Sequence, residues 1–236
     1  MMPLVTRLGA PFAAILMTCA CATTSPLLRQ ECYNADAQLA GVLRPLEALR
    51  AKGCDAAVVQ SGTSECDRLR REIERLALVC PGHVPTLMAI AVIAYDEHRP
   101  ATSQQVLDQI LAQPRSYPDA AVLRARIAVE EGNVPFSRRL LEQQIKLAPD
   151  HAGLHETYAA TLYLEGRLPE TRRELTMAGA LGAPRWRIAY HLGLVEEASG
   201  RFDEALRYFA EALAANPAWA PAQSHLNGLR AKMPPR

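Results

Sequence analysis

The sequence of 236 residues lacks the short motifs of the common catalytic sites. It contains no G-x-S-x-G nucleophile turn, no glycine-rich phosphate-binding loop and no H-E-x-x-H zinc motif. A catalytic centre would also need a carboxylate or histidine whose pKa is perturbed in a pocket, and the sequence offers no candidate. We therefore predict no catalytic residue, no metal site, no cofactor and no enzyme activity.

The sequence also has no excess of positive or negative charge. The chain has 26 lysine and arginine residues and 25 aspartate and glutamate residues. Proteins that bind nucleic acids through charge carry a clearly basic surface. The near balance argues against a nucleic-acid partner, and also against attachment to an anionic membrane through charge alone.

The apolar run near the N-terminus, Leu8 to Met17, is too short to span a bilayer as a helix. Arg7 precedes this run and small residues follow it, an arrangement typical of a signal peptide. We expect residues 1–20 to be a signal peptide that is removed on export.

The residues after this run resemble a bacterial lipoprotein signal, in which a small residue precedes the cysteine that is acylated. Ala20-Cys21 matches that requirement. The resemblance implies that Cys21 carries the lipid and that residues 21–30 tether the chain to a membrane. Ala22 follows in place of the aspartate associated with inner-membrane retention, which favours the periplasmic face of the outer membrane. Two alternatives stay open: acylation at Cys19, or a plain secretory signal.

Four cysteines remain in the exported part of the chain: Cys32, Cys54, Cys66 and Cys80. An even number suggests disulfides in an exported protein. Apolar residues at helical spacing predict helices over residues 31–51 and 65–79. If these helices run antiparallel, Cys32 lies beside Cys80 at one end and Cys54 lies beside Cys66 at the other. We therefore predict two nested bridges. A four-cysteine metal site is the alternative, but no pair has the C-x₂-C spacing typical of zinc.

Four kinds of residue recur with a period of about 34 in the rest of the chain. They are small residues (Ala91, Ala125, Ala159, Gly193), large apolar residues (Leu107, Leu141, Leu175, Phe209), glycines (Gly132, Gly166, Gly200) and prolines (Pro81, Pro114, Pro149, Pro184, Pro217). A fixed period of this length is typical of stacked helix pairs. The small residues would let the two helices of a pair approach closely, and the glycines would allow a left-handed turn between them. His98 stands where the first pair would have its glycine.

The pattern resembles the tetratricopeptide repeat (TPR) family, most closely at Leu192-Gly193, Ala205, Phe209 and Pro217. The resemblance implies an all-α fold, a right-handed superhelical solenoid of helix-turn-helix units. We predict a disulfide-stapled hairpin, four units and a C-terminal capping helix with its tail, over residues 31–83, 84–117, 118–151, 152–185, 186–219 and 220–236. An unrelated helical bundle is the alternative, but several independent series of residues share one period.

In the TPR family a concave groove is lined by first-helix residues spaced i, i+4, i+7. Carried onto this chain, these positions are Met88, Val92, Tyr95, Val122, Arg126, Val129, Glu156, Ala160, Tyr163, Tyr190, Leu194 and Glu197. Arg126 is nearly the only base among them, which disfavours a clamp for peptide carboxylates. The apolar and tyrosine content instead suits a peptide or amphipathic helix. The alternative is that part of this line is covered within the chain itself.

These features predict a lipid-anchored periplasmic scaffold or assembly factor that holds another cell-envelope protein in its groove. The plan is similar to that of TPR lipoproteins that assist secretins and pili. A module that regulates a cell-wall or secretion enzyme is the main alternative, and a self-assembling array is another. His151 and His155, four residues apart, could in principle share a metal ion, but they straddle the turn after Pro149 and have no third ligand in the sequence.

Overall fold

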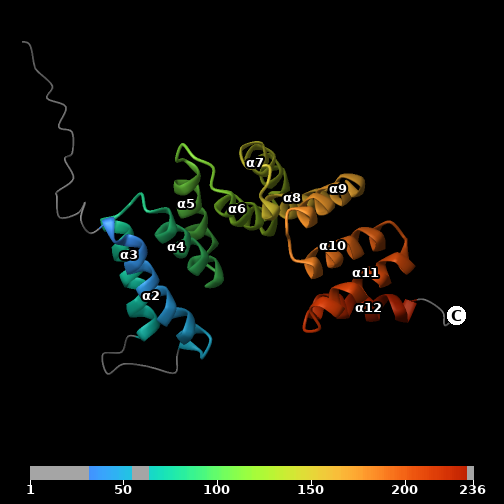
Figure 1. Cartoon of the computed structure of the whole chain (residues 1–236), viewed down its shortest axis with the longest axis horizontal. Helices are drawn as coiled ribbons and strands as arrows, with labels where there is room; N and C mark the ends of the chain where they lie inside the picture. The colour runs from blue at the N-terminus through green and yellow to red at the C-terminus, as the bar shows by residue number, and fades with distance from the viewer. Residues whose placement is uncertain (1–31, 55–63, 233–236) are drawn as a thin grey trace, which may run out of the picture.

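The computed structural model describes residues 32–54 and 64–232. The predicted signal peptide, Cys21 and the tether lie outside these residues. The described part is an all-α stack of helix pairs bent into an arch (Figure 1). In chain order its helices are α2 (Ala35–Arg50), α3 (Glu65–Val79), α4 (Val84–Asp96), α5 (Pro100–Leu111), α6 (Pro118–Glu130), α7 (Val134–Leu147), α8 (Ala152–Leu164), α9 (Leu168–Ala180), α10 (Arg185–Ala198), α11 (Phe202–Ala215) and α12 (Ala220–Lys232).

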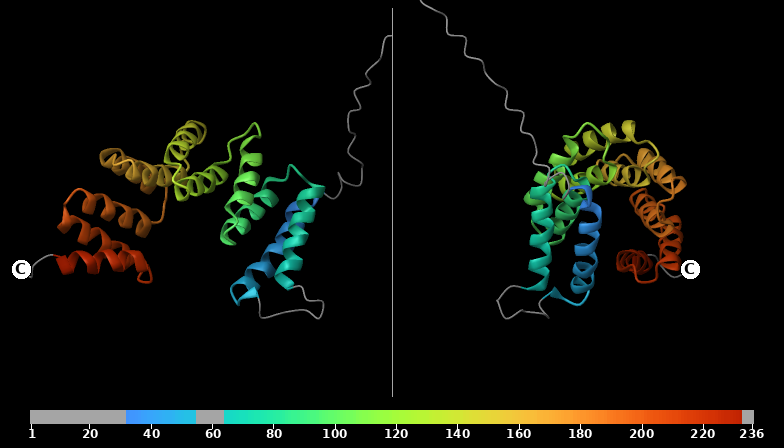
Figure 2. Two further views of the ribbon diagram at one scale, coloured as in Figure 1. Left: turned by 180° about the vertical axis from the view of Figure 1, so that it is seen from behind. Right: turned by 60° about the vertical axis from the view of Figure 1, so that its left-hand side comes forward.

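The N-terminal hairpin consists of α2 and α3, which lie side by side at one end of the arch (Figure 2). Disulfides join Cys32 to Cys80 and Cys54 to Cys66, the nested pairing that the sequence favours. The helix α3 begins at a capping box, in which the Ser64 hydroxyl accepts from the backbone N–H of Asp67 and the Asp67 carboxylate accepts from the backbone N–H of Ser64. Leu39, Leu46, Leu69 and Ile73 fill the space between the helices.

The middle of the chain is built from helix pairs that follow the 34-residue period. Each pair packs internally, α4 with α5, α6 with α7, α8 with α9 and α10 with α11, and each second helix also packs on the next pair. The small residues of the period are 0% exposed at Ala91, Ala125 and Ala159, and the large apolar residues that follow them are at most 1% exposed. The core is therefore a continuous series of small–large contacts along the array, as the period predicts.

The turn between the helices of each pair is left-handed. Gly132, Gly166 and Gly200 have φ angles of 78°, 72° and 73°, and His98 adopts φ 57° at the corresponding place of the first pair. His98 is the one non-glycine residue with positive φ in the described part of the chain. The first pair therefore has the same turn geometry although histidine replaces glycine. The Cβ atom of His98 makes this left-handed conformation sterically unfavourable.

The C-terminal end of the array is covered by α12. Ala222, Leu226 and Leu229 are buried against Ala205 and Phe209 of α11. This helix therefore closes the last core cluster, as expected for a capping element. No helix among residues 32–54 and 64–232 is long and apolar enough to cross a membrane.

Candidate functional site

Two neighbouring cavities lie along the first helices of the last three pairs, α6, α8 and α10. In Figure 1, α6 and α8 run along the inner side of the arch, whereas α7 and α9 lie outside it. The larger cavity, of about 480 Å³, is lined by Val122, Arg126, Gly153, Glu156, Thr157, Ala160, Trp186, Arg187, Tyr190, His191 and Trp219. The smaller, of about 250 Å³ and mostly apolar, is lined by Ala159, Ala160, Tyr163, Leu164, Thr171, Leu175, His191 and Leu194. Ala160 and His191 belong to both, and we call the two together the groove.

Seven of the twelve residues carried over from the TPR pattern line the groove: Val122, Arg126, Glu156, Ala160, Tyr163, Tyr190 and Leu194. The other five, Met88, Val92, Tyr95, Val129 and Glu197, line neither cavity. Glu197 faces α12, where it contacts His225 at 2.7 Å between Oε2 and Nδ1. The two cavities therefore lie in the C-terminal half of the array, and no residue of α4 lines either of them.

A second line of residues completes the groove. The TPR pattern, which assigns one line of residues to each first helix, does not include it. Gly153 and Thr157 of α8 stand 34 residues before Arg187 and His191 of α10, and all four line the larger cavity. Thr157 and His191 each follow a residue of the predicted line, Glu156 and Tyr190, by one position, and Gly153 and Arg187 precede the same two residues by three. These residues recur at the 34-residue period, so the sequence could have indicated them. The TPR pattern assigns one stripe of residues per helix, and the surface that two adjacent helices expose is wider than one stripe.

One end of the larger cavity is aromatic. The rings of Trp186 and Trp219 have centroids 4.8 Å apart, and Tyr190 meets Trp219 edge-on at 5.9 Å. Such tilted and edge-to-face pairs are favourable arrangements that hold the rings in place. The Nε1 of Trp219 is buried and has no hydrogen-bond partner in the described part of the chain. This end is therefore an aromatic wall that contains one buried, unpaired donor.

An ion pair crosses the floor of the larger cavity from α8 to α10. Arg187 donates to both carboxylate oxygens of Glu156, with Nε at 2.7 Å from Oε1, and His191 Nε2 lies 3.5 Å from Oε1. The burial of Glu156 opposes its ionisation, but hydrogen bonds and positive charge from His191 and Arg187 outweigh burial and lower its pKa to about 2. Arg187 is the second arginine of the groove, but its guanidinium is already engaged.

The tyrosines of the groove remain neutral at physiological pH. Burial is the first cause that raises the pKa of Tyr163 and of Tyr190, and the nearby Glu197 carboxylate raises both further. Each phenol therefore keeps its proton and can both donate and accept a hydrogen bond. The groove combines apolar walls with neutral hydroxyl groups.

Arg126 is the exposed base of the groove. Its guanidinium lies 5.5 Å from the ring centroid of Tyr95, whose hydroxyl donates to Glu130. Among the described residues no carboxylate oxygen lies within ion-pair distance of Arg126. It can therefore receive an acidic group of a ligand without first losing an ion pair.

The histidines have structural partners. His151 caps the start of α8, where its Nδ1 accepts from the backbone N–H of Leu154. His155 is buried between Glu174, at 2.6 Å from Nδ1, and the carbonyl oxygen of Pro149, at 2.8 Å from Nε2. The pair therefore does not converge on one point. No group of three or more metal-ligating side chains occurs within residues 32–54 and 64–232.

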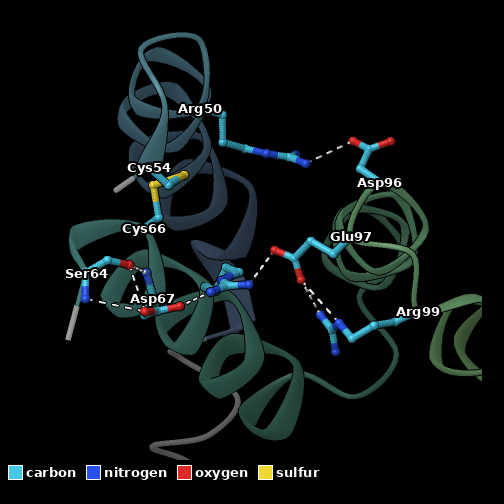
Figure 3. Close-up of polar contacts among 9 residues, drawn as sticks. Arg50, Cys54, Ser64, Cys66, Asp67, Asp96, Glu97 and Arg99 are labelled. Carbon is cyan, nitrogen blue, oxygen red and sulfur yellow. Dashed lines mark hydrogen bonds and ion pairs between the residues drawn. A yellow bond between two sulfur atoms is a disulfide. The ribbon is translucent and has the colours of Figure 1, made fainter. Parts of the chain in front are cut away.

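A larger cavity, of about 720 Å³, lies between the hairpin and α4. Figure 3 shows its polar rim, where Arg50 reaches Asp96 at 3.2 Å and Arg99 reaches Glu97 at 2.7 Å. Arg70 of α3 pairs with both Asp67 and Glu97. The three arginines that line it are all paired, so among the described residues this rim holds the hairpin against the first repeat and has no free cation for a ligand.

Comparison with known proteins supports the repeat architecture. Residues 186–219, which hold nearly all of α10 and α11, match the tetratricopeptide repeat family. A comparison with curated proteins gave no match.

Several solved structures share the fold. A thermophilic TPR protein in Thermus thermophilus superposes with a TM-score of 0.65 at 19% identity, over 82% of this chain and 99% of that one. YrrB, a TPR protein with an unusual peptide-binding site, superposes with a TM-score of 0.54 at 10% identity, over 87% and 98%. MamA from Desulfovibrio magneticus RS-1, from residue 41 to its end, superposes with a TM-score of 0.56 at 12% identity, over 77% and 97%. At these identities the likeness establishes the fold alone, a stack of TPR-like helix-turn-helix pairs.

Proposed function

We propose that this TPR chain is a periplasmic scaffold or assembly factor, anchored to the outer membrane through a lipid on Cys21. It binds a peptide or amphipathic helix of another cell-envelope protein in the groove of α6, α8 and α10. The anchor rests on the signal-like residues Leu8 to Cys21. The binding role rests on the geometry of the groove.

The observation that carries the binding role is the pairing of an aromatic-walled cavity with an apolar one. The cavity beside Trp186 and Trp219 and the one beside Tyr163 and Leu194 together provide about 730 Å³ in which apolar side chains can be buried. Aromatic side chains in partly desolvated pockets dominate the energy of protein interfaces. Arg126 at the rim adds one position that favours an acidic residue in the ligand.

Site-specific photo-crosslinking in the native envelope tests this proposal. A photoreactive amino acid at Arg126 is expected to form an adduct with one envelope protein, identified by mass spectrometry. The matched control is Arg207 of α11, an exposed arginine that lines neither cavity. If both positions yield the same adducts, or if Arg126 yields none, the groove is not the binding site.

Capture of that partner by purified protein provides an independent measurement. Tyr163→Ala combined with Trp186→Ala is expected to weaken capture at least about tenfold, because each removes an aromatic anchor. Leu147→Ala combined with Phe202→Ala removes exposed apolar side chains outside the groove and should leave capture unchanged. If both double variants bind equally well, the interaction uses another surface. If the captured partner is an enzyme whose rate changes on binding, the chain is instead a regulatory module.

The anchor is tested separately. Mass spectrometry of the N-terminal peptide from the membrane fraction should find the lipid on Cys21, and Cys21→Ala should release the chain from the membrane. A lipid on Cys19, or a soluble chain with an unmodified N-terminus, would contradict this assignment.

A further inference from the structure

One end of the hairpin carries two large apolar side chains that none of the described helices covers. Tyr33 is 89% exposed and Leu78 is 82% exposed. The other large apolar side chains on the surface of the described residues are at most 58% exposed. Such high exposure of both an aromatic and an aliphatic side chain at one end of a molecule indicates an interaction surface.

The disulfide Cys32–Cys80 brings these side chains to the same end. The Cα atoms of the two cysteines are 5.5 Å apart. Tyr33 directly follows Cys32, and Leu78 lies two residues before Cys80 in the last turn of α3. Both side chains therefore lie at the end of the hairpin that this bridge closes, and we call this end the tip.

The face of α3 that leads to this tip is basic. Arg71, Arg75 and Leu78 follow the spacing i, i+4, i+7 and so share one stripe of the helix. Both arginines are exposed, and the ion pairs that α3 forms in the described structure belong to Arg68 and Arg70 instead. Two exposed carboxylates partly offset the charge of the stripe: Glu74 adjoins it on α3, and Asp36 of α2 lies at the same end, with its Oδ1 3.1 Å from His83 Nε2.

The path of the chain places this tip near a membrane if Cys21 is acylated. Ten residues separate Cys21 from Cys32, and a fully extended chain of that length spans at most roughly 40 Å. The tip is thus the part of the described structure that is joined most directly to the proposed anchor. This step rests on the anchor given under the proposed function.

We propose that the tip formed by Tyr33 and Leu78, with Arg71 and Arg75 beside it, docks on the surface of an anionic phospholipid membrane. Tyrosine is favoured at the boundary between headgroups and acyl chains, and leucine is favoured just below it. Arginine can place its guanidinium at lipid phosphates while its stem covers apolar surface. Docking fixes the orientation of the arch relative to the membrane. The lipid anchor limits the distance of the groove from the membrane, and the docked tip sets the direction in which the groove faces.

Depth-dependent fluorescence quenching tests the docking without relying on acylation. A chain from residue 22 with an N-terminal histidine tag retains every described residue and binds vesicles of phosphatidylethanolamine, phosphatidylglycerol and a nickel-chelating lipid. The tryptophan of Tyr33→Trp is expected to be quenched by lipids brominated near the top of the acyl chains, beyond the quenching of Trp186 and Trp219 in the parent. Phe202→Trp, at the other end of the array, is the matched control and should show no added quenching.

A second set of variants separates docking from tethering. Adding Leu78→Ser, or Arg71→Gln with Arg75→Gln, to Tyr33→Trp should reduce the added quenching about tenfold and about threefold, because each removes part of the lipid contact. Leu147→Ser should have no effect. Equal quenching at positions 33 and 202, or quenching that Leu78→Ser does not alter, overturns the proposal. The synthetic tether replaces the lipid and no partner is present, so these results are independent of acylation at Cys21 and of binding in the groove.

Discussion

Gly193 of α10 and Phe209 of α11 are packed so closely that there is no room for a methyl group between them. A Cβ atom on Gly193 would lie 2.6 Å from Cε1 of the Phe209 ring, and Phe209 is fully buried. The preceding pairs combine alanine with leucine at the same two positions, as in Ala159 and Leu175. The last pair has a larger residue on one helix and a smaller one on the other, so the volume in the contact is conserved.

This relationship predicts a rescue. Gly193→Ala should destabilise the chain by about 1–3 kcal/mol, because the buried ring cannot move aside. Phe209→Leu should cost about 1 kcal/mol through lost contacts. The double variant recreates the alanine–leucine pair of the other units, and should be more stable than the sum of the single changes predicts. Urea unfolding of the four proteins measures this coupling; additive effects would contradict the close contact. Gly228→Ala in α12, where a Cβ meets nothing within 4 Å, is the control and should not destabilise.

The turn at His98 predicts a stabilising substitution. His98 has φ 57° in a turn that the later pairs close with glycine. His98→Gly should stabilise the chain by up to about 1 kcal/mol through relief of backbone strain, whereas Gly132→Ala should destabilise it by about 1 kcal/mol. Thermal unfolding of both variants measures the difference; a destabilised His98→Gly would mean that the side chain contributes more than its strained backbone costs.

The ion pair on the floor of the groove predicts a pH dependence in the acid range. The folded-state pKa of Glu156 is lowered to about 2, so the stability it contributes is fully present above its unfolded pKa, near 4, and is lost as the pH falls toward 2. Glu156→Gln should be less stable than the wild type by about 2–3 kcal/mol at pH 7, and the gap should close between about pH 5 and pH 2. Glu204→Gln alters an exposed ion pair with Arg207, and its free energy of unfolding should be almost equal to that of the wild type at both pH 7 and pH 2. If the difference in free energy of unfolding between the wild type and Glu156→Gln persists at pH 2, the contribution of this side chain comes from packing and not from its charge.

The two bridges of the hairpin should differ in their effect on stability. Cys32–Cys80 closes 48 residues and Cys54–Cys66 closes 12. Constraint of the unfolded chain grows with loop length, so Cys32→Ser with Cys80→Ser should cost about 4 kcal/mol and Cys54→Ser with Cys66→Ser about 3 kcal/mol. Urea unfolding of the oxidised proteins compares them. The reverse order would indicate that strain or residual structure, rather than loop length, sets the contribution.

The sequence alone determined the architecture because its signals are local and repeated. A period of 34 residues predicts helix pairs, and positions such as Leu107 and Leu141 show by their spacing which side of each helix is buried. The cysteine pairing also follows from sequence, since two antiparallel helices joined by a short connection leave one sensible arrangement for Cys32 and Cys80.

Which residues line the groove depends on the tertiary structure. Sequence spacing predicts a line of first-helix residues through all four units, but whether a line becomes a cavity depends on how neighbouring helices diverge. Met88 and Val92 share that line without lining either cavity, whereas Trp219, directly before the capping helix, completes the larger one. Glu156 reads as an exposed groove position and is instead a buried ion-pair partner of Arg187, 31 residues away. Local periodicity specifies which residues face one way, and only the packing of separate units specifies which of them meet.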